Sequence, residues 1–134
     1  MGIKYRQAFD QHRPAGFDGV FDWDFLKPAF KGTKIEPMDI DALVERHGKF
    51  LLLETKMHGK EAPQGQLIAL ERLVKLGRGD IKLFFVWGKT VSTIIAIEEW
   101  SYRGGVVIKN NRISCDGQYL LKKVSEWFNY ANSQ

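Results

Sequence analysis

The stretch that decides the fold runs from Pro37 to Lys56 and reads PMDIDALVERHGKFLLLETK. Its pattern predicts a strand over residues 39–45, a tight turn over residues 46–49 and a second strand over residues 50–56. The apolar run that opens the second strand favours burial on both of its faces. The sequence therefore predicts a β-hairpin whose second strand lies inside a sheet.

The hairpin brings two acidic residues together. An even loop, either His47-Gly48 alone or residues 46–49, pairs residues whose numbers sum to 95, so Asp41 lies opposite Glu54 (41 + 54 = 95). Direct cross-strand partners have Cβ atoms about 4.5–5.5 Å apart. Two carboxylates at that distance repel each other, and Lys56 or a divalent cation would compensate the repulsion.

Oxygen ligands at this position favour magnesium. Asp39 shares the face of Asp41, because side chains alternate along a strand, and it lies opposite Lys56. Mg²⁺ is typically bound by one or two carboxylates together with water and substrate phosphate, and the backbone carbonyl of Thr55 can add a ligand. A metal ion that lowers the pKa of water, next to an ammonium group, suits attack on a phosphodiester.

These residues resemble the PD-(D/E)XK nuclease superfamily. The similar segments are Pro37-Met-Asp39-Ile-Asp41, then Glu54-Thr-Lys56 after a gap of twelve residues, and Gln64-Gly-Gln66-Leu67. The resemblance implies a restriction-endonuclease-like α/β fold, in which helices flank a mixed central sheet. It also implies that the chain is a metal-dependent deoxyribonuclease with DNA as its partner.

The resemblance assigns roles to individual residues. It implies that Asp41 and Glu54 bind Mg²⁺, with Mn²⁺ as a substitute, and that Lys56 orients or activates water. Gln66 would contact the water, the metal shell or DNA. Met38 separates the proline from Asp39, so Asp41 is the preferred ligand and Asp39 the second.

The family's upstream acid has no clear counterpart. Residues 1–35 contain no glutamate, and Asp22 or Asp24 are the candidates to replace it. The first core strand is expected in residues 17–23 or residues 33–36.

The rest of the chain predicts alternating helices and strands. Leu67, Leu70, Leu73 and Val74 recur at helical spacing, Pro63 precedes them and Gly77 supplies a stop. The further expected elements are a short helix over residues 22–30, strands over residues 81–87 and 91–100, a hairpin of residues 106–109 and 112–114 across Asn110-Asn111, and an amphipathic final helix capped by Asp116.

Length, charge and cysteine content indicate the domain organisation, the kind of partner and the location of the chain. A chain of 134 residues predicts one nuclease domain over residues 1–134, made of a basic and aromatic segment (1–36), the catalytic hairpin and helix (37–77), and the remaining sheet with the final helix (78–134). The net charge of +4 fits a polyanionic partner. The lone Cys115 excludes an internal disulfide and fits the cytoplasm, and no apolar run reaches the length of a membrane span.

Two other interpretations of the motif stay open. Glu54 and Lys56 are alternatively a solvated salt bridge on an edge strand, or the chain is a non-catalytic nucleic-acid-binding module that keeps the nuclease fold. A domain of this size has little surface for reading base sequence, so structure-selective cutting is the expectation. Stand-alone members of the superfamily often act as dimers, which makes a homodimer an expectation from the resemblance.

Overall fold

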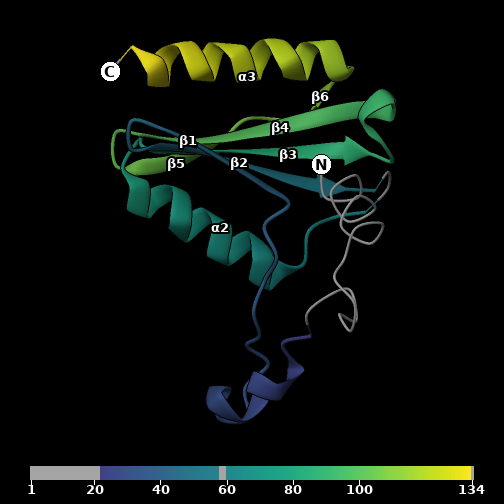
Figure 1. Ribbon diagram of the computed structural model, residues 1–134, viewed down its shortest axis with the longest axis vertical. Coiled ribbons are helices and arrows are strands. Elements are labelled where there is room, and N and C mark those ends of the chain that lie inside the picture. Colours follow the sequence, from purple (N-terminus) through teal and green to yellow (C-terminus); the bar gives the residue numbers. More distant parts are fainter. Residues whose placement is uncertain (1–21, 58–59, 134) are drawn as a thin grey trace, which may run out of the picture. The chain divides into compact units, whose positions relative to one another are not determined.

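The computed structural model describes residues 22–57 and 60–133. These residues fall into two compact units, one ending at Asp39 and the other beginning at Ile40. Within the second unit, the described residues form a six-stranded mixed sheet with one long helix on each face (Figure 1). The predicted α/β class is confirmed, and the organisation as a single nuclease domain stays a prediction.

A two-residue turn joins β1 (Ala42–Arg46) to β2 (Lys49–Lys56). His47 and Gly48 have φ angles of 53° and 81°, and positive φ at both central residues defines a type I′ turn. Ala42 pairs with Leu53 and Arg46 with Lys49, so the numbers of paired residues sum to 95. The shorter of the two predicted loops is therefore the one that forms.

The first strand begins later than the sequence predicted. Ladder pairing starts at Ala42, and Asp39, expected as the first residue of that strand, belongs to the other unit. The side chain of Asp41 accepts the Thr55 backbone N–H at 2.8 Å. Because the Thr55 N–H donates to this side chain, it does not bond to the backbone of the first strand, which explains why ladder pairing stops at Ala42.

A helical crossover makes β2 and β3 parallel. Helix α2 (Gln64–Gly77) leads into β3 (Ile81–Gly88), which pairs with β2 from Phe50 opposite Ile81 to Lys56 opposite Trp87. The helix ends where predicted, at Gly77. A Cβ atom on Gly77 would lie 2.5 Å from the side chain of Ile81, so the turn into β3 requires glycine at this position.

The later strands differ from the prediction. A short 3-10 turn, η2 (Val91–Thr93), precedes β4 (Ile94–Arg103), so the strand expected from residue 91 starts at Ile94. Gly104 and Gly105, with φ angles of 60° and 89°, turn the chain into β5 (Val106–Lys109).

The predicted hairpin across Asn110-Asn111 is wrong. β5 pairs with the end of β4, from Trp100 to Arg103, whereas β6 (Ile113–Ser114) pairs with Ala96 and Ile97 earlier on the same strand. The backbone N–H of Asn110 bonds to the Glu99 carbonyl oxygen at 3.0 Å. The long strand β4 therefore offers its free edge to both segments in succession, and they do not pair with each other.

Each face of the sheet has its own apolar core. Helix α2 packs Leu70 and Val74 against one face, and α3 (Gly117–Asn132) packs Trp127 and Ala131 against the other (Figure 1). The sheet residues under α2 are Leu52, Leu83, Phe85, Trp87, Ala96 and Trp100, and those under α3 are Leu51, Phe84, Val86, Ile94 and Ile97. The apolar run of β2 is thus buried on both faces, as predicted.

The structure also tests the elements that the sequence predicted before β1 and at the start of α3. Asp116 caps α3 by accepting the Tyr119 N–H at 3.0 Å, as predicted. No strand precedes β1 in the described residues, because residues 33–36 are irregular and most of residues 17–23 lie outside the described range. Residues 24–30 form a 3-10 helix, η1 (Asp24–Phe30), with Pro28 inside it.

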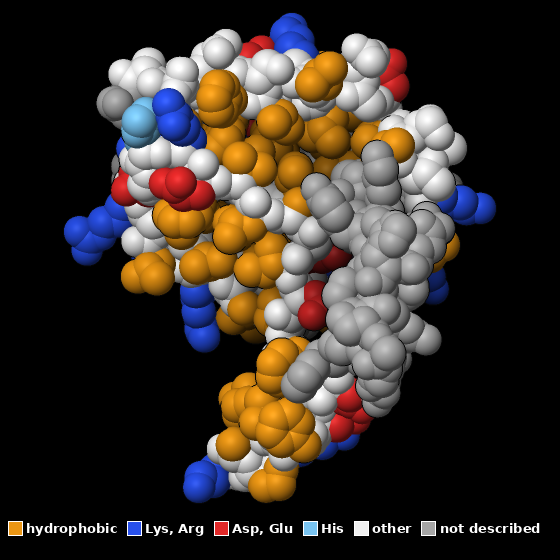
Figure 2. Space-filling model, viewed as in Figure 1, with side chains coloured by type: hydrophobic (Ala, Val, Ile, Leu, Met, Phe, Trp, Pro, Cys, Tyr) orange, Lys and Arg blue, Asp and Glu red, His pale blue; other side chains and the backbone are white. Residues whose placement is uncertain are grey.

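Strand β1 is an edge of the sheet and carries exposed apolar side chains. Leu43 is 55% exposed and Val44 is 39% exposed, and Figure 2 shows hydrophobic side chains grouped along this strand. In residues 22–57 and 60–133, no helix combines the length and the apolar character needed to cross a bilayer.

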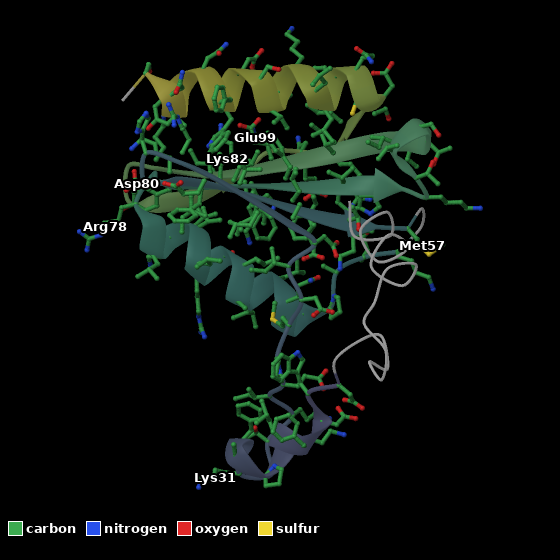
Figure 3. All side chains as sticks on the ribbon, in the orientation of Figure 1. Lys31, Met57, Arg78, Asp80, Lys82 and Glu99 are labelled. Carbon is green, nitrogen blue, oxygen red and sulfur yellow. The ribbon has the colours of Figure 1, made fainter. Side chains whose placement is uncertain are left out.

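A charged cluster links the sheet to α3. The Glu99 carboxylate lies 2.7 Å from Lys82 Nζ and 3.2 Å from Lys123 Nζ, and Figure 3 shows Lys82 and Glu99 on the side of the sheet that α3 covers. Partial burial disfavours the charged form of Glu99, but the bonds from the two lysines outweigh that effect and hold its pKa below the usual value.

We expect Glu99→Gln to lower the free energy of unfolding at neutral pH by roughly 1 kcal/mol, allowing for solvent screening. A carboxyl group whose pKa is lowered by folding stabilises the native state above its ordinary pKa of 4.5, and this contribution is lost as the pH falls through the folded pKa. Urea unfolding at neutral pH and in acid measures it. The difference between wild type and Glu99→Gln should shrink in acid, and a constant difference would contradict the assignment.

Candidate functional site

Asp41 and Glu54 meet at the end of the β1–β2 hairpin. The Asp41 carboxylate accepts hydrogen bonds from the Thr55 backbone N–H at 2.8 Å and from the Thr55 hydroxyl at 2.7 Å, and it is also hydrogen-bonded to Glu54. Glu54 is 6% exposed and is the one charged side chain that is buried among the described residues. Two carboxyl groups in contact, one of them buried, need a proton or a cation between them.

The surroundings of Asp41 favour its ionised form. Burial raises the pKa of Asp41, but the hydrogen bonds from Glu54 and Thr55 and the positive charge of Lys56 outweigh burial and hold it below its usual value. The neighbours of Asp41 therefore favour its carboxylate form.

Lys56 and Gln66 complete the group. Lys56 Nζ donates to Gln66 Oε1 at 2.5 Å, which ties the last residue of β2 to the first turn of α2. Leu52 packs under α2, and side chains alternate along a strand, so Glu54 and Lys56 point to the same helix-covered face. The structure thus brings Asp41, Glu54, Lys56 and Gln66 together, as the sequence predicted.

The alternative of a solvated salt bridge on an edge strand is wrong. β2 lies between β1 and β3 in the sheet, and the Glu54 side chain is almost completely buried. Ionisable groups rarely occupy such positions without a specific role.

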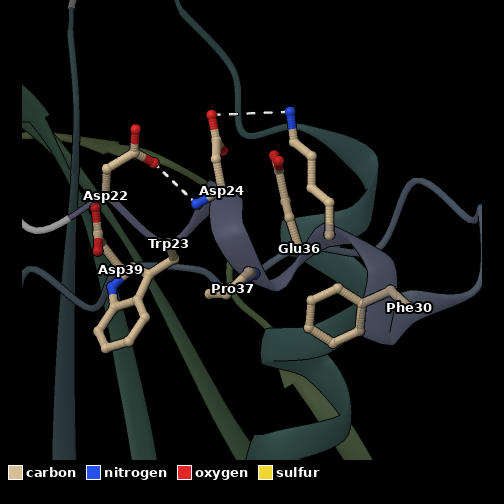
Figure 4. Close-up of a pocket in the computed structure, with 8 residues that line it drawn as sticks. Asp22, Trp23, Asp24, Phe30, Glu36, Pro37 and Asp39 are labelled. Atoms are coloured by element: carbon tan, nitrogen blue, oxygen red, sulfur yellow. Dashed lines mark hydrogen bonds and ion pairs between the residues drawn. The ribbon is translucent and has the colours of Figure 1, made fainter.

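Asp39, Asp22 and Asp24 lie in the first unit, around a cavity of about 460 Å³ (Figure 4). Asp22 Oδ1 accepts the Asp24 N–H at 2.9 Å, and the Asp24 carboxylate lies 3.8 Å from Lys27 Nζ. The remaining lining residues are Trp23, Lys27, Phe30, Glu36 and Pro37. The roles of Asp39 as a second ligand and of Asp22 or Asp24 as the upstream acid stay predictions.

The ligands available to a metal at the hairpin are two carboxylates. Within the described ranges, no three His, Cys, Asp or Glu side chains are grouped in a way that could hold a metal ion. Asp41 and Glu54, with the Thr55 carbonyl as a predicted third oxygen, nevertheless fit Mg²⁺, which takes one or two carboxylates and completes its shell with water and phosphate. The contact between the acids is the observation that supports this fit, because a cation between them would take the place of a shared proton.

The structure adds an arginine that the sequence did not indicate. The guanidinium of Arg112 lies 3.6 Å from the ring centroid of Trp87, which is the register partner of Lys56 on β3. Arg112 Nε donates to Glu98 at 3.0 Å, and Nη2 donates to Glu61 at 2.7 Å. Only the pairing of β6 with β4 brings this residue beside β3, so no local pattern in the sequence could have identified it.

Trp87 also holds the segment that joins Lys56 to α2. Its indole N–H donates to the Lys60 carbonyl oxygen at 2.8 Å, next to Glu61. The pKa of Arg112 lies above its usual value, because the hydrogen bond to Glu61 and that to Glu98 outweigh partial desolvation. An ion pair as exposed as Arg112–Glu61 contributes only about 0–1 kcal/mol to stability.

Comparisons with protein-family models, with curated proteins and with solved structures found no match to this chain.

We expect Glu54→Gln to leave the free energy of unfolding unchanged within about 0.5 kcal/mol, or to raise it. The amide keeps the size of the side chain and can donate to Asp41, and unlike a carboxyl group it does so without first binding a proton. Chemical denaturation of both proteins at neutral pH without divalent metal gives the comparison. A loss of several kcal/mol would show that Glu54 is retained for stability instead.

Proposed function

We propose that this chain is a Mg²⁺-dependent nuclease that hydrolyses phosphodiester bonds of DNA and that its α/β fold is of the restriction-endonuclease-like kind. The observation that carries the proposal is the contact of buried Glu54 with Asp41 beside the Lys56–Gln66 pair. Two acids and an ammonium group within one small region favour phosphodiester chemistry over a purely structural role.

Asp41 and Glu54 are the residues that would hold Mg²⁺, together with the backbone carbonyl of Thr55. Bound there, the ion would screen the charge of the phosphate and lower the pKa of water. Thr55 contributes independently of the ion, because its N–H and hydroxyl both bond to Asp41 and fix the orientation of that carboxylate.

Lys56 supplies the positive charge that faces the substrate. Its ammonium group is held by Gln66, so that it orients a water molecule or a phosphate oxygen with little loss of side-chain freedom on binding. Gln66 acts by positioning Lys56, since its Oε1 is the acceptor in their bond. The first turn of α2 therefore determines where the ammonium group lies.

The charge of the chain supports DNA as the substrate. Its small size supports cleavage that selects DNA by its structure and not by its base sequence. The net charge of +4 attracts a polyanion, and phosphate contacts supply affinity without reading bases. A chain of 134 residues offers little surface for reading base sequence. A cytoplasmic location, which the lone Cys115 supports, and a homodimer, which follows from the family resemblance, belong to the same proposal.

Asp41→Asn, Glu54→Gln and Lys56→Met should each reduce cleavage by at least about 100-fold, because each removes a charge that the reaction needs. The assay incubates circular single-stranded, circular duplex and branched DNA with and without Mg²⁺. Glu126→Gln, which changes an exposed acid on α3, is the matched control and should cleave like the wild type.

Robust cleavage by the Glu54→Gln protein would contradict the proposal. Salt-sensitive DNA binding with no Mg²⁺-dependent cleavage by the wild type would favour the non-catalytic nucleic-acid-binding module instead. Cleavage of closed circles would exclude an enzyme that acts only from DNA ends.

A further inference from the structure

Arg112 is held at three points. The ring of Trp87 lies below its guanidinium at 3.6 Å, Glu98 accepts from Nε at 3.0 Å, and Glu61 accepts from Nη2 at 2.7 Å. The guanidinium is therefore fixed in one plane, with one end turned toward Glu61. A group oriented in this way can bind an oxyanion without first losing side-chain freedom.

The two acidic partners of Arg112 differ in how firmly they are placed. Glu98 lies on β4, its side chain is 20% exposed, and it also lies 3.4 Å from the indole N–H of Trp100. Glu61 lies in the irregular segment before α2, and its side chain is 66% exposed. Glu98 is thus fixed as part of β4, whereas Glu61 can move away from Arg112 without disturbing the sheet.

Arg112 lies beside the candidate catalytic residues. Trp87 and Lys56 are register partners on adjacent parallel strands, so their side chains emerge on the same face of the sheet. The guanidinium of Arg112 therefore stacks on the side chain that neighbours Lys56 on this face. A DNA backbone that reaches Lys56 would bring another phosphate close to Arg112.

We propose that Arg112 binds a backbone phosphate of the DNA substrate and that Glu61 occupies this position on Arg112 until the phosphate displaces it. The proposal rests on the proposed nuclease function, because it takes the substrate to be DNA lying across Lys56. Glu61 is a substitute anion, which keeps the arginine paired before DNA binds. Glu98 and Trp87 remain in contact with Arg112 throughout and act as positioning residues.

The proposed exchange of Glu61 for a DNA phosphate on Arg112 is tested by DNA binding. Binding of a fluorescein-labelled duplex with a single-stranded tail is measured by fluorescence anisotropy without divalent metal. Arg112→Gln should weaken binding about tenfold and reduce the slope of log K against log salt by about one, as expected for one lost phosphate contact. Glu61→Gln should tighten binding about two- to fivefold, because the phosphate then has no carboxylate to displace.

The double variant Arg112→Gln/Glu61→Gln distinguishes the exchange on Arg112 from a general repulsion between Glu61 and DNA. In the Arg112→Gln background, Glu61→Gln should no longer tighten binding, whereas removal of a repelling charge alone would tighten it equally in both backgrounds. Arg103→Gln and Glu126→Gln, which change exposed charges on β4 and α3, are the matched controls. Thermal unfolding of each variant shows whether it is folded, and Arg112→Lys supplies a second test that keeps the charge.

The outcomes distinguish this proposal from the one it rests on. If the wild type does not bind DNA at all, the proposed function fails. If it binds DNA but Arg112→Gln keeps the wild-type affinity and salt slope, or Glu61→Gln tightens binding equally in both backgrounds, the exchange is overturned while the nuclease proposal stands.

Discussion

The two-residue turn at His47 and Gly48 determines which residues of β1 face which residues of β2. Both turn residues have positive φ, and the type I′ geometry that they adopt matches the twist of the strands on either side. A shift of the register by one residue would send every side chain of β1 to the opposite face. The observed register is the one that places Asp41 next to Glu54.

The crossover through α2 turns this hairpin into a site. Because α2 returns the chain so that β3 runs parallel to β2, the carboxyl ends of both strands lie at the same end of the sheet. The first turn of α2 lies over these strand ends. Lys56 meets Gln66 there, and Trp87 meets the Lys60 carbonyl. The same connection therefore positions the proposed catalytic lysine and the loop that carries Glu61.

The acidic side chains at this end of the sheet lower the stability of the fold. Glu54 is buried against a second carboxyl group, and its position in a central strand would be filled more favourably by an apolar side chain. By contrast, the Lys82–Glu99–Lys123 cluster on the other face pairs opposite charges and contributes to stability. The difference between the two clusters is the physical reason for assigning function to one and structure to the other.

The amino-acid sequence by itself determined the hairpin, its register, the helix that ends at Gly77 and the position of Asp41 opposite Glu54, on the face that also carries Lys56. These features depend on turn geometry, side-chain alternation and helical spacing, which act between residues that are close in the chain. Only the tertiary structure decided that β5 and β6 share one edge of β4, because pairing between distant strands leaves no local pattern. For the same reason it alone placed Arg112 over Trp87, beside Lys56, where the sequence had indicated only a strand.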